Sequence, residues 1–415
     1  MSRLTSFAAT LVLAASAASV PAHAAQGPAP VPLLAQIEVQ VSELAAPDAF
    51  STPGRDTGLP RDLWRGTPVE TARTVLPMLN GKPLSPASAA LALRVLATGA
   101  PGPDGAAGDE ALAGARAGAL LALGDFTAAA RVLDRAPGQD RNPDVARAAA
   151  EAALLADQAR RACAIADGLA SGRGDIYWLR LRAFCQVEAE QTAQAQLTFD
   201  LAQTQSRDAV YGRLMGARLS GGAGAPGAAS LRNGLDLALS RSLGLDLSTA
   251  KPAPAVAAAL SGEAPAPPVF DTAAIDAEIG GLGEAIAAGP PPQGAVSALI
   301  AAALDADPKT RTRMQSAALL AAALSGELPA ADRGRIAAFA VAEGKSPAGR
   351  NLALEAAADA RRAGEVALLA LWTSADAGAA GPALADRVRI VRALARAGLM
   401  GEARAFVLEG LAGLK

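Results

Sequence analysis

The chain has 415 residues, a formal net charge of -2 and only 3% aromatic residues, and its lysines and arginines are scattered rather than clustered. Nucleic-acid-binding proteins normally carry a basic patch, so this charge distribution argues against a nucleic-acid partner. The low aromatic content also disfavours base-stacking platforms and aromatic carbohydrate clefts. Two cysteines are too few for an all-thiolate zinc site. We therefore expect neither a cofactor nor a bound metal.

The first 24 residues have the pattern of a secretory signal peptide. Arg3 precedes an apolar core that ends at the small-residue triplet Ala22-His23-Ala24, which predicts cleavage after Ala24. This predicts a bacterial protein that is periplasmic or secreted. Cleavage would remove His23, the only histidine, and with it the imidazole that Ser-His-Asp catalysis, Cys-His catalysis and most zinc sites require. No later apolar run approaches the ~20 residues needed to span a bilayer, so we expect no stable membrane insertion.

Two segments follow the predicted cleavage site. Residues 25–62 are rich in proline, glycine and alanine and form a predicted N-terminal extension, in which Ile37 to Val41 alternate as in an extended strand. From Trp64 onward the pattern predicts a pair of helices, the second with Ser85 as N-cap and Pro86 as its first residue. This segment is similar to one found in uncharacterised alanine-rich bacterial envelope proteins, a resemblance that implies no activity.

The middle of the chain repeats itself with a period of about 33 residues. Alanine recurs at 117, 150 and 183 in the first half of the unit and at 129, 162 and 195 in the second half. Three short breaks separate the halves and predict turns between paired helices: Gly124-Asp125-Phe126, Ala156-Asp157-Gln158 and Ala189-Glu190-Gln191. Similar patterns at Ala363-Gly364-Glu365-Val366 and Ala397-Gly398-Leu399-Met400 extend the repeat toward the C-terminus, with Gly326-Glu327-Leu328 as a weaker member. Each unit is therefore predicted to be a helical hairpin.

Leu121 to Pro137, LALGDFTAAARVLDRAP, resembles the tetratricopeptide repeat (TPR). The similarity includes the turn with Phe126, followed by Ala129, Leu133 and Ala136, while the next unit has Trp178, Leu181 and Cys185 with Ala195, Phe199 and Ala202. The resemblance covers roughly Asp109 to Ser220 and Ser346 to Leu414. It implies an all-α fold, an α-solenoid of helical hairpins in one elongated superhelical array, either continuous or in two halves. The family mostly binds peptides or proteins on its concave face.

Cys163 and Cys185, the only cysteines, lie at equal distances from the turn that contains Arg173, Gly174 and Asp175. In an antiparallel helix pair, residues equally far from the turn lie side by side, and both cysteines fall on apolar faces. We therefore predict a structural disulfide. The Arg-Gly-Asp tripeptide is interpreted as a turn, with Gly174 supplying backbone freedom and Asp175 capping the next helix, rather than as a cell-adhesion site.

Proline-rich stretches divide the rest of the chain. KPAPAVAAALSGEAPAPP, residues 251–268, and the cluster Gly289-Pro290-Pro291-Pro292 predict an irregular connection with one helix over residues 251–292. The connection separates a front repeat array, residues 63–250, from a rear array, residues 293–415. Gly344-Lys345-Ser346 resembles the end of a phosphate-binding loop, but Phe339 occupies a position where that motif needs glycine. Ser346 and Pro347 are therefore interpreted as the start of a helix.

Secretion, repeats and the missing imidazole together favour a non-catalytic scaffold in the cell envelope that binds a protein or peptide. The alternative is a protein that acts on peptidoglycan or another glycan through carboxylates alone, since two carboxylates suffice for glycoside cleavage. No catalytic, cofactor-binding or metal-binding residue is assigned. A third hypothesis, attachment to host cells through Arg173 to Asp175, is the weakest.

Overall fold

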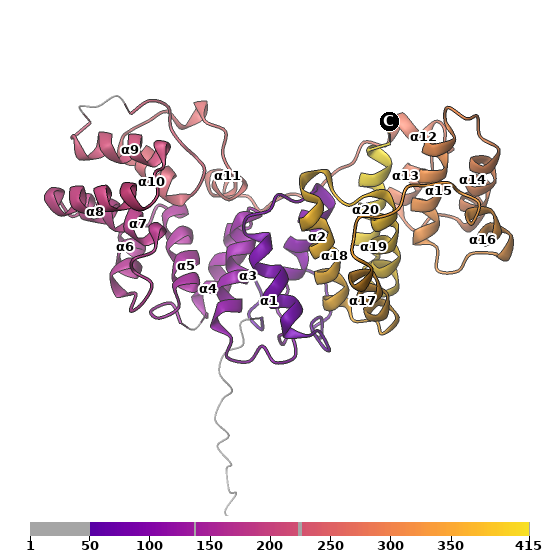
Figure 1. The fold of residues 1–415 in the computed structure, drawn as a ribbon, viewed down its shortest axis with the longest axis horizontal. Helices are drawn as coiled ribbons and strands as arrows, with labels where there is room; N and C mark the ends of the chain where they lie inside the picture. The colour runs from indigo at the N-terminus through magenta and orange to yellow at the C-terminus, as the bar shows by residue number, and fades with distance from the viewer. Residues whose placement is uncertain (1–49, 137, 223–225, 415) are drawn as a thin grey trace, which may run out of the picture. The chain divides into compact units, whose positions relative to one another are not determined.

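The computed structural model describes residues 50–136, 138–222 and 226–414. The predicted signal peptide and the alternating run Ile37–Val41 lie outside these ranges. The described residues form α-helices and no strand, which confirms the predicted all-α class (Figure 1). The helices of the front half are α1 Val69–Leu79, α2 Pro86–Ala97, α3 Glu110–Ala122, α4 Phe126–Asp134, α5 Pro143–Leu155, α6 Ala159–Gly168, α7 Ile176–Glu188, α8 Thr192–Gln205, α9 Ala209–Leu219 and α10 Gly234–Ser242.

The rear half of the described chain contains ten further helices. They are α11 Pro254–Ser261, α12 Ala273–Asp276, α13 Leu282–Ala288, α14 Gln293–Asp305, α15 Arg311–Leu324, α16 Ala330–Ile336, α17 Ala348–Asp359, α18 Ala363–Ala377, α19 Leu384–Arg396 and α20 Met400–Ala412. Short 3-10 turns lie at Leu247–Thr249 and Gly378–Ala380. The predicted helix pair after Trp64 is confirmed as α1 and α2, with Ser85 at the N-cap position and Pro86 as the first helical residue.

The repeated turns share one backbone conformation. Each of the three predicted middle breaks joins two helices, and equivalent turns precede α18 and α20. In all five turns the residue that follows the C-cap of the first helix has a left-handed φ. These residues are Gly124, Asp157, Glu190, Arg361 and Gly398. The next amide then bonds back to a carbonyl five residues earlier, as Gln191 N does to Gln186 O at 2.8 Å. This is the Schellman ending, which satisfies carbonyls that the helix itself leaves unpaired.

Successive hairpins pack through small residues. Helix α3 packs on α4 and α5, and α5 packs on α6, with Ala113, Ala117 and Ala149 buried where these helices meet. Alanine lets helix axes approach closely while still favouring the helix. Helix α10 departs from this order, because it packs against α5 as well as against its neighbour α9.

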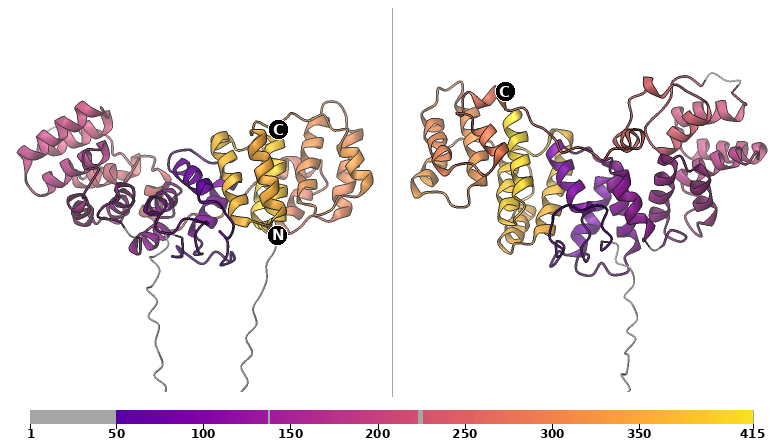
Figure 2. Two further views of the ribbon diagram at one scale, coloured as in Figure 1. Left: turned by 60° about the horizontal axis from the view of Figure 1, so that its bottom comes forward. Right: turned by 180° about the vertical axis from the view of Figure 1, so that it is seen from behind.

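The order of contacts differs from the order of the chain. Helices α17 to α20 pack between α1 and α2 on one side and α15 on the other, although α1 and α18 are separated by nearly the whole sequence (Figure 2). The approach is close at Gly364, whose amide donates to the Leu63 carbonyl at 3.0 Å. A Cβ on Gly364 would lie 2.7 Å from that same oxygen. In a solenoid each repeat contacts only its neighbours in the chain. The contact between α1 and α18 does not follow that order, so the predicted solenoid arrangement is not confirmed.

Helix α2 depends on distant residues at both of its ends. At its start the Glu409 carboxylate accepts from Ala87 N at 2.8 Å and from Ser85 Oγ at 2.9 Å. Arg387 Nη1 donates to the same carboxylate at 2.6 Å, and both side chains are largely buried. Ser85 therefore occupies the N-cap position while its own hydroxyl makes no capping bond. A negative charge at a helix N-terminus is also favoured by the helix dipole.

The C-terminal end of α2 is bound by Arg116 of α3. This fully buried guanidinium donates to the carbonyls of Leu96 at 2.7 Å, Thr98 at 3.0 Å and Thr52 at 3.0 Å. Its carbon also lies 5.6 Å from the centre of the Phe50 ring. The first described residues are thus held against the core, and a cation binds the Leu96 carbonyl in the last turn of α2, which the helix dipole favours.

Two further carboxylates cap segments from a distance. Glu151 of α5 accepts from Gly234 N, the first residue of α10, at 2.8 Å. Asp386 of α19 accepts from Lys345 N at 2.6 Å and Ser346 N at 3.1 Å, just before α17. In each case the start of a helix is bound by a side chain from another helix, so these helix starts depend on long-range contacts.

Replacing Glu409 with alanine should lower the free energy of unfolding by about 3–5 kcal/mol, because Arg387 would keep a buried charge without its carboxylate. Urea denaturation followed by circular dichroism measures this. Glu355→Ala, an exposed change on α17, is the matched control and should stay within about 0.5 kcal/mol of the unmodified protein. A Glu409→Ala variant as stable as this control would contradict the role given to Glu409.

Replacing Glu190 with glycine should stabilise the protein by about 0.5–1 kcal/mol. The left-handed conformation costs a non-glycine residue roughly 1–2 kcal/mol, and the loss of unfolded-state restriction offsets part of the gain. Gln194→Gly, in the exposed interior of α8, should instead destabilise by about 1 kcal/mol. The same denaturation experiment distinguishes them, and a loss of stability in both variants would show that Glu190 is not strained.

Candidate interaction surfaces

The structure brings the two cysteines together. Cys163 of α6 and Cys185 of α7 are disulfide-bonded, with their Cα atoms 5.5 Å apart. Cys185 is buried in a cluster with Trp178, Leu181 and Ala166, and Cys163 packs partly buried against it. The disulfide thus joins two hairpins from within an apolar cluster, which fits a structural role.

The Arg173-Gly174-Asp175 tripeptide lies, exposed, in the connection between α6 and α7. Asp175 occupies the N-cap position of α7, as expected, but its side chain makes no capping hydrogen bond. The expectation for Gly174 is wrong, because the left-handed residue of this connection is Gly172, with φ of 72°. The turn is set two residues earlier, where the chain passes Pro143.

Helix α8 exposes an apolar stripe. It buries only Ala195 and Ala202. On its outer surface Leu197 is 72% exposed and Leu201 is 55% exposed. Residues four apart lie on the same face of a helix, so these two leucines are neighbours. Asp200 and Thr204 line a shallow hollow beside the stripe.

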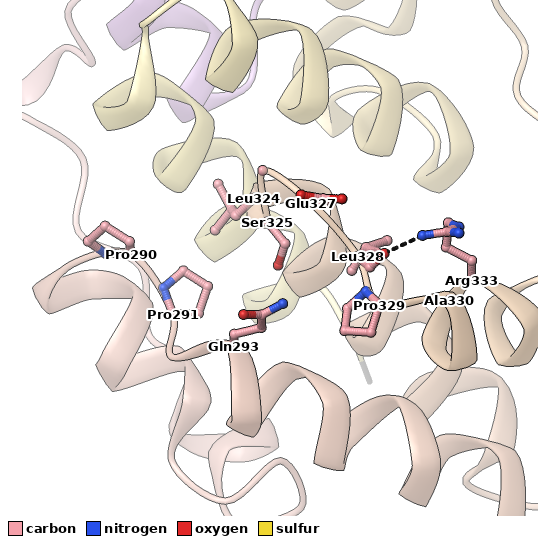
Figure 3. A pocket seen from close by; sticks show the side chains of 11 residues that line it. Pro290, Pro291, Gln293, Leu324, Ser325, Glu327, Leu328, Pro329, Ala330 and Arg333 are labelled. Carbon is pink, nitrogen blue, oxygen red and sulfur yellow. Dashed lines mark hydrogen bonds between the residues drawn. The ribbon is translucent and has the colours of Figure 1, made fainter.

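A cleft of about 440 Å³ lies where α14, α15 and α16 converge (Figure 3). Pro290, Pro291 and Pro329 contribute to its rim, and Gln293 and Glu327 contribute polar groups. The guanidinium of Arg333, also in the lining, donates to the Leu328 carbonyl at 2.6 Å. The predicted repeat member Gly326-Glu327-Leu328 is therefore part of the cleft wall.

The carboxylates of these surfaces are dispersed. Glu327 is the only carboxylate lining the proline-edged cleft, and Asp200 is the only one lining the hollow on α8. Glycosidases place two carboxyl groups ~5–9.5 Å apart across the bond they cleave. Neither of these two surfaces presents such a pair.

A partly buried polar cluster joins α5, α7 and α10. Burial raises the pKa of Glu151, although its hydrogen bond from Gly234 N opposes the shift. Burial, together with the nearby Glu151 charge, raises the pKa of Tyr177 well above its usual range. The Arg147 guanidinium lies 4.8 Å from the centre of the Tyr177 ring. Because Oε2 of Glu151 accepts from the first amide of α10, the cluster attaches α10 to α5.

Gly344-Lys345-Ser346 does not form an open phosphate loop. Its amides are bound by the Asp386 carboxylate, and a Cβ on Gly344 would collide with that same group. Helix α17 begins at Ala348 with Pro347 as its N-cap, one residue later than expected. A carboxylate already fills the place that a phosphate would take.

The described residues contain no group of three or more potential metal-binding side chains. None of their helices combines the length and the apolar character that a membrane span requires. Comparison with known proteins found no family model, no curated protein and no solved structure that matches this chain.

Removal of the disulfide should be costly. Its cysteines are 22 residues apart, and closing a loop of this size in the unfolded chain should contribute about 3 kcal/mol. We expect Cys163→Ala/Cys185→Ala to lose that amount in urea denaturation, and reduction of the unmodified protein to have the same effect. Mass spectrometry of non-reduced peptides from the protein isolated without reductant should show one linked pair. Two free thiols would overturn the prediction.

Proposed function

We propose that this protein is a non-catalytic, periplasmic helical-repeat scaffold that binds a protein or peptide partner in the cell envelope. The signal-peptide pattern supports the location. The hairpins support the binding role, because their buried positions match those of the TPR resemblance: Ala129, Leu133, Trp178 and Leu181 all lie in the core. Repeats of this kind present extended surfaces rather than a single deep pocket.

The observation that carries the proposal is the exposed leucine pair on α8. The corresponding helix of an earlier hairpin, α4, buries Val132 and Leu133 as well as two alanines. Helix α8 instead leaves Leu197 and Leu201 in solvent. Covering the exposed parts of both side chains would contribute about 2–4 kcal/mol to an association. An amphipathic helix or apolar groove of an envelope protein is the partner that such a stripe fits.

The test compares partner recovery between variants in crosslinked cell envelopes. Leu197→Gln/Leu201→Gln keeps side-chain length and helix propensity, so the fold should persist while the apolar contact is lost. Leu352→Gln is the matched control, because Leu352 is 68% exposed on a different helix. Quantitative mass spectrometry of the captured proteins is the readout.

We expect the unmodified protein and the Leu352 variant to recover the same one or two envelope proteins. With the double variant the amount recovered should fall about tenfold, which corresponds to ~1.4 kcal/mol of binding free energy. Equal recovery of the same proteins by all three would overturn the assignment of α8. Recovery of glycan fragments without protein would favour action on the cell wall instead.

A further inference from the structure

The connection between α11 and α12, residues 262–272, is not used by the proposed binding surface. It is anchored at both ends. Helix α11 packs on α3, α4 and α5 with Val256 fully buried, and Phe270 and Ile275 pack into the same core on the other side. Between these anchors the chain runs as an irregular segment without helix or strand, visible after α11 in Figure 1. Its sequence from Glu263 is EAPAPPVFD.

The prolines restrict this stretch to one backbone conformation. Proline fixes φ near -65°, and a residue that precedes proline is driven out of the helical region into the extended or polyproline II region. Ala264, Ala266 and Pro267 each precede a proline, and the described chain contains no cis peptide bond. The whole run from Ala264 to Pro268 is thus pre-organised toward a polyproline II helix.

Exposure along the stretch follows the three-residue period of that helix. Pro265 and Pro268, one turn apart, are half-buried against the protein. The other two edges, Ala264 with Pro267 and Ala266 with Val269, face solvent, and Val269 is 96% exposed. Two apolar edges of a stiff helix are therefore presented outward, while the third edge rests on the protein.

The backbone polar groups from Ala264 to Phe270 remain available to a partner. Among the described residues, none forms a backbone-to-backbone hydrogen bond with the segment from Ala264 to Phe270. The exposed carboxylates of Glu263 and Asp271 flank the stretch. Asp271 Oδ1 accepts from Ala273 N at 3.0 Å, and no ion pair within the described residues involves either carboxylate. A complementary surface would combine aromatic side chains, donors for the free carbonyls and basic groups at its two ends.

We propose that residues 263–271 are a ligand for a folded protein domain whose groove is lined by aromatic side chains and edged by basic ones. Such grooves recognise polyproline II segments because the ligand has little conformational entropy left to lose. The inference rests on the proposed function only in requiring a protein partner. It names a second contact, independent of α8, and the chemistry of the partner that makes it.

The experiment places a photoreactive benzoylphenylalanine at position 269 of the full-length chain, in the cells that produce it. After irradiation, mass spectrometry identifies the adduct and the partner residue that is linked. The same residue is placed at position 352 as a control for exposure. A second variant combines the probe at 269 with Pro265→Gly/Pro267→Gly/Pro268→Gly, which keeps the length but removes the stiffness, and circular dichroism verifies that it is folded.

We expect one protein adduct at 269, linked within an aromatic-lined groove, absent at 352 and at least tenfold weaker in the glycine variant. The proposal is overturned by the absence of an adduct, by an adduct that the glycine substitutions leave unchanged, or by linkage to a surface without aromatic side chains. If any of these occurs while Leu197→Gln/Leu201→Gln still abolishes partner recovery, the scaffold function stands and only the linker assignment fails.

Discussion

The position of α2 is the constraint on which the arrangement of the described chain depends. Glu409 accepts from an amide at its N-terminus, and Arg116 donates to the Leu96 carbonyl near its C-terminus, so each end depends on a residue of another helix in addition to the adjacent Thr98. Buried, unpaired backbone groups are costly, and a helix capped in this way forms its full set of hydrogen bonds only when α3 and α20 are both in place. This requirement explains why the C-terminal hairpins lie against α1 and α2 rather than at the far end of an array.

Local structure could be predicted from the sequence to a large extent. The 33-residue period located the turns at Asp157 and Glu190, and the symmetry about the intervening turn brought Cys163 to Cys185. These features depend on residues close together in the chain. The packing of α18 on α1 could not be predicted in this way, because one alanine-rich face looks like another and the contact is specified by single residues such as Gly364. The exposure of Leu197 was missed for the same reason, since helical periodicity cannot show which apolar face lacks a neighbour.

The two proposed interaction surfaces differ in structure. Helix α8 buries two alanines and leaves its leucines outside, while the segment after α11 is too rich in proline to join either helical neighbour. One surface is a helix face, which a partner would cover by apolar contact. The other is a stiff extended ligand with acidic flanks, which a partner would enclose. The two differ in chemistry, so a scaffold that uses both could hold two partners at once.

Zero-length carbodiimide crosslinking tests the central claim most directly. Lys82, just before α2, lies 2.9 Å from Asp376 of α18, and both side chains are accessible to reagent. Because the reagent joins an amine to a carboxylate without a spacer, the account predicts a crosslinked peptide that connects Lys82 to Asp376 in the monomeric protein. If Lys82 links only to carboxylates near it in sequence, the C-terminal hairpins do not pack on α1 and α2 as described.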